Sequence, residues 1–286
     1  MSFCRSDVLA RSRRLRFVLP VVLVFLGLGL YAFWYEPSGI RAGHYTIELN
    51  LAERISPRPL RVAVISDLHA GAPYIGLAKI ERVVALANEQ KPDFILLTGD
   101  YVITEVIGGG YIPIEATVAK LRALTAPMGV YAVLGNHDDV DDPIKIADAF
   151  EQAGIRVLQD KAVELEQDDG PIYLIGFKNF FDGPVMDVVP TNVPPGAHVL
   201  CFTHSPDVFP LLPSNCALTI AGHTHGGQVL LPFLGRLIVP SRYGQRYAAG
   251  VIRENGKTLF VSTGIGTTFI PVRFGVPPEV SILEIW

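Results

Sequence analysis

The sequence predicts an α/β fold that follows one N-terminal membrane-spanning helix. Short β-branched runs alternate with amphipathic segments over most of the chain, as in folds whose helices cover their sheets. Additional strand-like runs fall late in the chain, and an uncharged stretch over residues 17–35 precedes all of them. With 286 residues, of which 49% are hydrophobic, the chain is large enough to bury a sizeable core.

The N-terminal stretch has the length and the flanks of a membrane anchor. As a helix, residues 17–35 would be about 28 Å long, which matches the hydrocarbon core of a bilayer. Tyr31, Trp34 and Tyr35 lie at its outer end, where an aromatic belt is expected. Five arginines and one aspartate precede it, so the positive-inside rule predicts a single-pass protein with its N-terminus in the cytoplasm and its folded domain outside. A cleaved signal peptide is the alternative, although residues 29–32 match a cleavage site poorly.

The net charge is distributed unevenly along the chain. The first 35 residues carry a charge of +4, and because the whole chain carries −4, the remainder carries −8. An acidic domain of this kind argues against a nucleic-acid partner. For Cys201 and Cys216 we expect two buried thiols, one in a core strand and one near the start of a strand, with a disulfide between them as the alternative.

The predicted elements follow in order after a polar linker at residues 36–43. Strands are predicted at the short apolar or alternating runs 45–51, 61–66, 94–98, 129–134, around 157, 162–166, 172–176, 197–202, 217–221, 247–253, 259–262 and 280–285. Helices are predicted where apolar residues recur at helical spacing, in 76–90 and 114–124, and after Pro143, in 143–153. We therefore expect four segments: a basic cytoplasmic segment (1–16), an anchor (17–35), a linker with the first strand (36–59) and one folded domain (60–286).

Polar side chains recur at one kind of position, directly after a predicted buried strand. The residues concerned are Asp67, His69, Asp100, Asn136, His137, His204, His223 and His225. Because the carboxyl ends of strands in α/β sheets converge on a ligand crevice, these segments aim carboxylates, an amide and imidazoles at one region. Mixed oxygen and nitrogen ligands of this kind predict a metal site. The two other histidines, His44 in the linker and His198 within a strand, are expected to have structural roles.

The ordered set D-x-H, G-D, G-N-H-D, a single His and G-H-x-H resembles the signature of the calcineurin-like metallophosphoesterases. Residues 239–244 and 271–279 further resemble the membrane-associated branch of YkuE and YaeI type. The resemblance implies a four-layer α/β/β/α sandwich of two mixed sheets. It also implies two divalent ions of manganese, iron or zinc, the first held by Asp67, His69 and His225, the second by Asn136, His204 and His223, with Asp100 bridging them. Such a pair would activate water to hydroxide for attack on a phosphoester.

By the same resemblance, His137 is the catalytic residue, which gives a proton to the leaving oxygen or stabilises charge on the phosphoryl group. A hydrogen-bonding role beside the ligands is its alternative. Many relatives read G-D-x-x-D, but here Ile103 stands where the second carboxylate would orient the histidine. The partner of His137 is left open among Thr104, Glu105, Asp138, Asp139 and none. Candidate contacts to substrate phosphate are Arg242, Tyr243, Arg246 and Arg273, for each of which a structural role is the alternative.

These observations predict a membrane-anchored phosphodiesterase or pyrophosphatase that acts on a lipid-linked or membrane-proximal phosphoester. A UDP-2,3-diacylglucosamine pyrophosphatase-like enzyme is one alternative, although its substrate is cytoplasmic and the arginines predict the opposite side. A non-catalytic metal-binding membrane protein and a nuclease of the same fold are the others. We expect the membrane and the phosphoester substrate as partners, no nucleic acid, and the sequence implies no protein partner.

Overall fold

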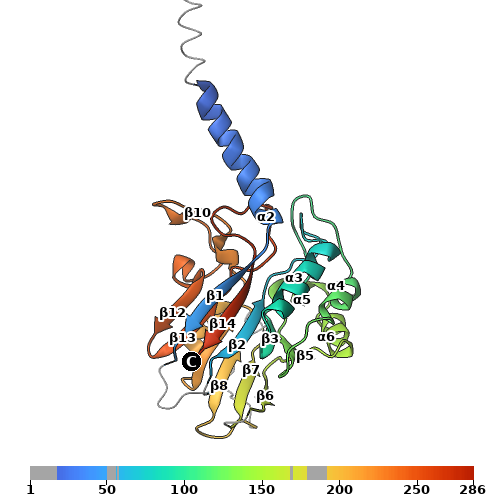
Figure 1. Cartoon of the computed structure of the whole chain (residues 1–286), viewed down its shortest axis with the longest axis vertical. Coiled ribbons are helices and arrows are strands. Elements are labelled where there is room, and N and C mark those ends of the chain that lie inside the picture. Colours follow the sequence, from blue (N-terminus) through green and yellow to red (C-terminus); the bar gives the residue numbers. More distant parts are fainter. Residues whose placement is uncertain (1–17, 50–55, 57, 168–169, 179–191) are drawn as a thin grey trace, which may run out of the picture.

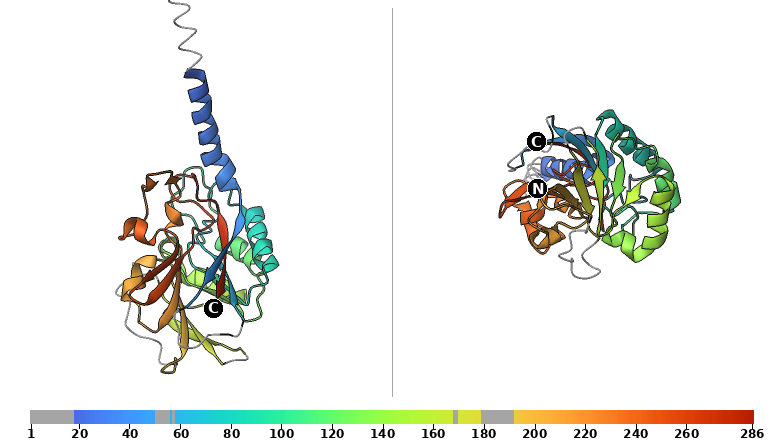
Figure 2. Two further views of the ribbon diagram at one scale, coloured as in Figure 1. Left: turned by 60° about the vertical axis from the view of Figure 1, so that its left-hand side comes forward. Right: turned by 90° about the horizontal axis from the view of Figure 1, so that it is seen from below.

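Two six-stranded mixed sheets pack face to face in the computed structural model, which describes residues 18–49, 56, 58–167, 170–178 and 192–286 (Figures 1 and 2). The first sheet has the strand order β1 (Arg41–Ile47), β14 (Glu279–Ile285), β2 (Leu60–Ile65), β3 (Phe94–Leu97), β4 (Val130–Ala132) and β5 (Arg156–Val157). The second has the order β12 (Gly250–Glu254), β13 (Lys257–Val261), β9 (Cys216–Ala221), β8 (His198–Phe202), β7 (Ile172–Gly176) and β6 (Lys161–Leu165). The predicted α/β class with two mixed sheets is confirmed.

Helices cover the outer face of the first sheet. They are α3 (Leu77–Glu89), α4 (Ile114–Leu121), α5 (Asn136–Asp141) and α6 (Pro143–Gln152). In α3 the apolar residues at helical spacing, such as Ile80 and Val83, are buried against the sheet, as the sequence predicted. In the described residues, the second sheet is instead covered by the short 3-10 helices η3 (Pro206–Leu211) and η5 (Gly244–Tyr247). The predicted outer helical layer is therefore thinner on this side.

The core between the sheets combines aliphatic and aromatic side chains. Val62 and Leu96 of the first sheet and Leu200, Leu218 and Ile220 of the second are buried there. Burying each such side chain stabilises the fold by roughly 1.5–3 kcal/mol. This core fixes how the two sheets are superposed, and so it fixes where their strand ends meet.

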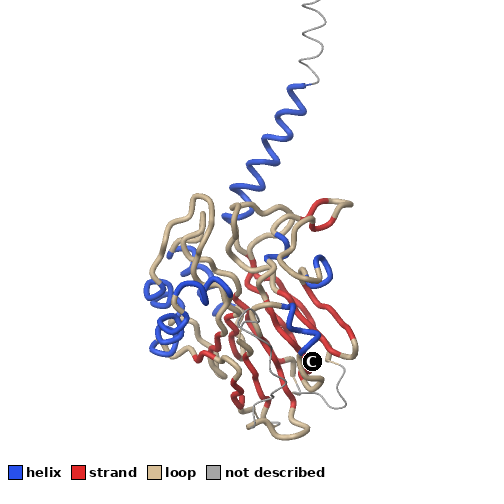
Figure 3. The backbone as a smooth tube through the Cα atoms, turned by 180° about the vertical axis from the view of Figure 1, so that it is seen from behind, coloured by secondary structure: helices blue, strands red, loops and turns tan. Residues whose placement is uncertain are grey.

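The strand directions place the ends of both sheets beside the N-terminal helix. Strand β1 runs parallel to β14, and β14 runs antiparallel to β2. The start of β1, which follows the helix directly, therefore lies beside the carboxyl end of β2. Strands β2, β3 and β4 are parallel, as are β7, β8, β9 and β13. The small hairpin of β10 (Leu230–Leu231) and β11 (Gly235–Arg236) lies at the same end as the helix in Figures 1 and 3.

The N-terminal helix, Val18–Ser38, is long and apolar enough to cross a membrane, and its last turns are built into the domain. These turns are η1 (Tyr31–Tyr35), which is π-helical, and α2 (Glu36–Ser38). The expected polar linker at 36–43 was wrong, because the helix continues to Ser38 and β1 begins at Arg41. His44 accordingly lies in β1. Residues 1–17 are outside the described part of the chain, so the basic cytoplasmic segment stays a prediction.

Pro37 explains how this junction is held. Proline has no amide hydrogen, so carbonyl groups about one turn earlier in the helix are left for other donors. The amide of Arg273 donates to the carbonyl of Ala32 at 2.9 Å, and the Tyr74 hydroxyl donates to that of Phe33 at 2.9 Å. Glu36 accepts from two further backbone amides of the domain, those of Gly275 at 2.9 Å and Val276 at 2.7 Å. The helix is thus attached directly to the fold.

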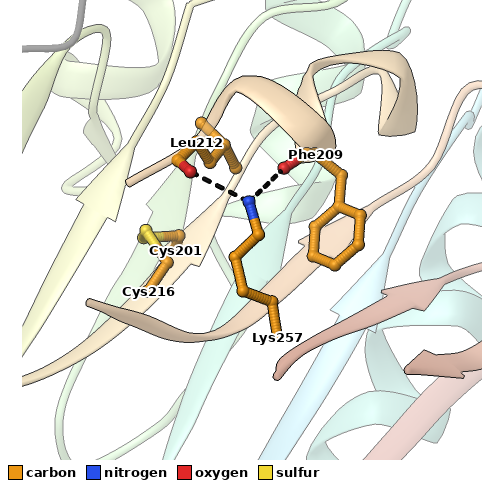
Figure 4. Close-up of a disulfide and its surroundings, with 5 residues drawn as sticks. All are labelled: Cys201, Phe209, Leu212, Cys216 and Lys257. Carbon is orange, nitrogen blue, oxygen red and sulfur yellow. Dashed lines mark hydrogen bonds between the residues drawn. A yellow bond between two sulfur atoms is a disulfide. The ribbon is translucent and has the colours of Figure 1, made fainter. Parts of the chain in front are cut away.

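A disulfide joins Cys201 in β8 to Cys216 at the start of β9 (Figure 4). The expectation of two buried thiols was wrong. The two strands are neighbours, and a register irregularity after Val199 lets both cysteines face the same outer cluster with their Cα atoms 5.7 Å apart. Beside them, the Lys257 ammonium donates to the carbonyls of Phe209 at 2.9 Å and Leu212 at 3.0 Å.

Candidate metal centre

The eight predicted site residues meet at the carboxyl ends of the strands. Asp67 and His69 follow β2, Asp100 follows β3, Asn136 and His137 begin α5 after β4, His204 follows β8, and His223 and His225 follow β9. Five of them have left-handed backbones: Asp67 (φ 53°), His69 (φ 45°), Asp100 (φ 58°), His223 (φ 69°) and His225 (φ 51°). Each such conformation costs roughly 1–2 kcal/mol in a residue with a Cβ. Strained backbones concentrated at one place are typical of functional sites.

Two glycines of the motifs allow the segments to approach one another. A Cβ atom at Gly135 would lie 2.1 Å from Oδ1 of Asp100. At Gly222 it would lie 1.8 Å from the hydroxyl oxygen of Ser66 and 2.6 Å from Oδ2 of Asp67. Any larger residue at either position would push a carboxylate out of the site, which explains why glycine precedes Asn136 and His223.

Asp67, His69 and His225 form a first cluster, with ligand atoms within 4.8 Å of one another. The Nδ1 atom of His69 lies 3.2 Å from the carbonyl of Val102, which only accepts, so Nδ1 carries the hydrogen. Its Nε2 lone pair then points at Nε2 of His225, 3.1 Å away, and this second nitrogen lies 3.6 Å from Oδ1 of Asp67. The carboxylate of Asp67 and the two imidazole nitrogens converge on one point, and these three donors fit a divalent metal.

Asp100, His204 and His223 form a second cluster, to which Asn136 adds an amide oxygen. The Nδ1 atom of His204 faces the Thr98 carbonyl at 2.8 Å, so Nδ1 carries a hydrogen and Nε2 is the atom that would bind a metal. This Nε2 lies 3.0 Å from Oδ1 of Asn136, 3.0 Å from Nδ1 of His223 and 3.3 Å from Oδ2 of Asp100.

The carboxylate of Asp100 lies between the two clusters. Its Oδ2 is 3.6 Å from Nε2 of His69 as well as 3.3 Å from Nε2 of His204. Because the same oxygen faces both clusters, the arrangement fits the bridging role that the resemblance implies.

Burial sets the protonation of the ligands. It raises the pKa of Asp67 to about 6 and lowers the pKa of His69 to about 4 and that of His223 to about 3. These imidazoles are therefore neutral near pH 7, as metal ligands must be. For His204, burial lowers the pKa, but the charge of Asp100 and the hydrogen bond to it outweigh burial and raise the pKa to about 10. Metal binding at the second cluster must therefore displace a proton from His204.

Supporting groups hold the ligands in place. The amide of His223 donates to both oxygens of Asp67 at 3.0 and 3.1 Å, and the Ser66 hydroxyl donates to Oδ2 of the same carboxylate. Buried Asp138 accepts from the amides of Gly135, Asp100 and Tyr101, each at 2.8 Å. The sequence analysis did not identify Ser66 or the orienting carbonyls. The carbonyls leave no signal in a sequence, because every residue type has one. The role of Asp138 had a signal, an acidic residue three positions after the glycine that precedes a helix.

His137 projects from the first turn of α5 toward the same region. Its Nε2 is 4.0 Å from Oδ2 of Asp100, and its Nδ1 is hydrogen-bonded to the hydroxyl of Thr104. Thr104 is therefore the partner, among the alternatives left open by the sequence. Ile103 packs against the core beneath the first sheet's helices.

A cavity of about 400 Å³ opens in front of the metal centre. Its lining includes His137, His223 and Arg242. Two other residues predicted to contact substrate, Tyr243 and Arg246, interact with other parts of the domain. Tyr243 packs against Tyr247 with ring centroids 4.7 Å apart, and Arg246 pairs with Glu254 at 2.5 and 2.6 Å.

Arg273, the remaining candidate for phosphate contact, is fully buried. Its guanidinium donates to the carbonyls of Val276 at 2.9 Å, Thr263 at 3.0 Å and Gly266 at 3.1 Å. It therefore ties together the loop between β13 and β14, which passes over the site, and its role is structural.

Comparison with known proteins gives a consistent answer. The family model for calcineurin-like phosphoesterases matches residues 60–227. The uncharacterized metallophosphoesterase YkuE of Bacillus subtilis is 29% identical over 259 residues, which cover 89% of this chain and 88% of that protein. Phosphodiesterase YaeI of Escherichia coli is 27% identical over 286 residues, covering 97% of this chain and all of that protein. A transmembrane protein with a metallophosphoesterase domain from Danio rerio is 25% identical over 246 residues, which cover 78% of this chain and 52% of that protein.

The matched segment contains every residue of both clusters as well as His137, and it spans more than half of the chain. The chain therefore belongs to the calcineurin-like phosphoesterase family and is a metal-dependent phosphoester hydrolase.

Proposed function

We propose that the protein is a membrane-anchored phosphodiesterase with two divalent metal ions, and that its substrate is a lipid-linked phosphoester. The observation that carries the proposal is the position of Asp100, between two ligand clusters and in front of an open cavity. The diester class is supported by the relative YaeI, which is named a phosphodiesterase.

In this proposal, one ion is held by Asp67, His69 and His225, the other by Asn136, His204 and His223, and Asp100 contributes to both. Manganese, iron and zinc all suit this mixture of oxygen and nitrogen ligands. When bound, such a pair supplies an activated water and neutralises charge on the phosphoryl oxygens.

His137 and Arg242, which line the cavity, are assigned roles toward the substrate. A hydroxyl can donate to Nδ1 of His137, and the ring then carries its proton at Nε2, beside the cavity. Burial lowers the pKa of His137, so the neutral ring is favoured. We assign the Nε2–H of neutral His137 a hydrogen bond that stabilises the charge developing on the leaving oxygen or on the phosphoryl oxygens. Arg242, which lines the same cavity, is placed to meet the charged phosphoryl group.

The membrane supplies the substrate in this account. The helix Val18–Ser38 enters the domain at the end of the sheets where the metal centre lies, so the cavity opens close to the bilayer. The arginines before residue 17 support an extracytoplasmic domain. The disulfide Cys201–Cys216 supports the same side, because disulfides persist in oxidising compartments.

The activity can be tested with the full-length chain in detergent. It should hydrolyse bis-p-nitrophenyl phosphate when manganese is added and lose this activity in excess chelator. A protein that binds two metals without turnover of any phosphodiester would support the alternative of a non-catalytic metal-binding membrane protein.

The topology needs a separate test. The test fuses a reporter enzyme after residue 286, and the reporter is of a kind that works only outside the cytoplasm. This fusion should show reporter activity. Activity of a second fusion, to a reporter that works only in the cytoplasm, would overturn the placement. It would favour the UDP-2,3-diacylglucosamine alternative, whose substrate is cytoplasmic.

A further inference from the structure

A second, apolar cavity of about 350 Å³ adjoins the metal centre. Its walls are largely hydrocarbon and include Val229, Leu237 and Ile238, from around the β10–β11 hairpin, and Phe269, Ile270 and Val272, from the loop between β13 and β14. The volume falls in the range of roughly 300–1,000 Å³ that is typical of small-molecule sites. The mechanism above uses none of these side chains.

The two cavities share a wall. His225, Pro240, Thr268 and Phe269 line both the apolar cavity and the cavity in front of the metal centre. A ligand that filled both would carry a phosphoester at one end and an apolar group at the other. The shared wall therefore points to an amphiphile rather than to two unrelated ligands.

Large apolar side chains around this cavity are exposed. Phe233, Leu234, Leu237 and Ile238 belong to the β10–β11 hairpin and the segment after it, and Phe269 and Ile270 belong to the loop between β13 and β14. Exposed apolar surface gathered in one place marks an interaction site.

The N-terminal helix indicates what covers this surface. Tyr31, at the expected aromatic belt, packs against Phe274 with ring centroids 5.8 Å apart. Phe274 is in turn bonded to the hairpin, because its carbonyl accepts from the amide of Leu230 at 2.8 Å. Aromatic belts lie at the boundary between lipid and water. The hairpin and the loop are thus tied to the helix at that boundary, and both lie at the helix end of the domain in Figures 1 and 3.

We propose that the apolar cavity binds one acyl chain of the lipid whose phosphoester reaches the metal centre. The inference rests on the proposed function and names its substrate class as a phosphodiester that carries a long acyl or alkyl chain. The chain enters from the bilayer past Leu237 and Ile238, and its phosphoester end lies beyond His225 at the metals.

The test compares two substrates that release the same product. Full-length protein in detergent would be given bis-p-nitrophenyl phosphate, which has no chain, and hexadecyl p-nitrophenyl phosphate, which has one. The proposal predicts a kcat/KM at least about tenfold higher for the hexadecyl substrate. Ile238→Asp, which places a charge in the cavity wall, should lower the ratio of the two values about tenfold.

Ile144→Asp is the matched control, since Ile144 in α6 is as exposed as Ile238, at 75% against 79%, and lies far from the cavity on the outer helical layer. It should leave both kcat/KM values unchanged. Leu237→Asp is a second test variant, and the midpoint of thermal unfolding shows that each variant is folded. Binding of the fluorescent fatty acid cis-parinaric acid should weaken about tenfold in Ile238→Asp and Leu237→Asp but not in Ile144→Asp.

The outcomes separate the two claims. If the wild-type protein hydrolyses the chainless substrate but prefers neither substrate, and Ile238→Asp changes neither the ratio nor the fatty-acid binding, the acyl site is refuted and the phosphodiesterase stands. The other outcome is that the wild-type protein hydrolyses neither substrate but binds cis-parinaric acid, and that Ile238→Asp loses this binding. The acyl site then stands and the proposed function fails.

Discussion

Leu218 and His223 lie five residues apart on one segment, and they show how differently the two parts of this domain are built. Leu218, in β9, is fully buried among aliphatic side chains between the sheets. His223, just past the end of the strand, has a φ of 69° and a ring nitrogen 3.0 Å from that of His204. The strand interiors follow ordinary rules of packing, whereas the strand ends hold left-handed backbones and convergent metal-ligating groups. Stability and function should therefore respond to different substitutions.

The largest effect is expected from Asp100→Asn. The amide removes the negative charge between the clusters, so both metals should bind more weakly and turnover should fall about 1,000-fold or more. The metal-free variant should unfold at a lower temperature than the wild-type protein, because His204 loses the carboxylate that stabilises its charge. Metal content, kcat and thermal unfolding check this, and a variant that retained full activity would show that the bridging role is wrong.

Leu218→Ala should give the opposite result. The cavity left between the sheets should lower the free energy of unfolding by about 2–5 kcal/mol. Metal stoichiometry and kcat, measured at a temperature where the variant is folded, should stay close to wild-type values. Denaturant unfolding measures the loss, and a change in metal stoichiometry would mean that core and site are not separable in this way.

His137→Ala tests the site without touching the predicted ligands. Loss of the Nε2–H hydrogen bond should lower kcat about 100-fold, while both metals remain bound. If metal content fell together with kcat, His137 would be a ligand and not a hydrogen-bond donor to the substrate.

Thr104→Val should have the smallest effect. It preserves the shape of the side chain but removes the hydroxyl that orients His137, so kcat should fall about tenfold, with KM and metal content unchanged. Thr104→Ser, which retains the hydroxyl, should recover most of the activity. Equal activities for the Val and Ser variants would show that the hydroxyl plays no part.

The same contrast explains how far the sequence could be interpreted. Strands such as β2 and β3 were predicted within a residue or two, because their apolar runs are set by burial alone. The eight polar residues were located because each follows such a run. The hydroxyl partner of His137 could only be narrowed to a few residues, since it depends on how the loop after Asp100 packs against α5.

Two further features needed the fold. Cys201 and Cys216 can bond only because β8 and β9 are neighbours with an irregular register, which strand-by-strand reasoning does not supply. The junction of helix and domain was expected to be a polar linker, because Pro37 and Gly39 are residues that commonly end a helix. Instead, the missing amide of Pro37 leaves carbonyls that Arg273 and Tyr74 bind from sequence positions far away.

The most direct test of the two-metal centre is electron paramagnetic resonance of the full-length protein loaded with manganese, combined with elemental analysis. The account predicts two manganese ions per chain and the spectrum of an exchange-coupled pair, which Asp100→Asn abolishes. One ion per chain, or two ions that give only the six-line signal of isolated manganese, would contradict a centre bridged by Asp100.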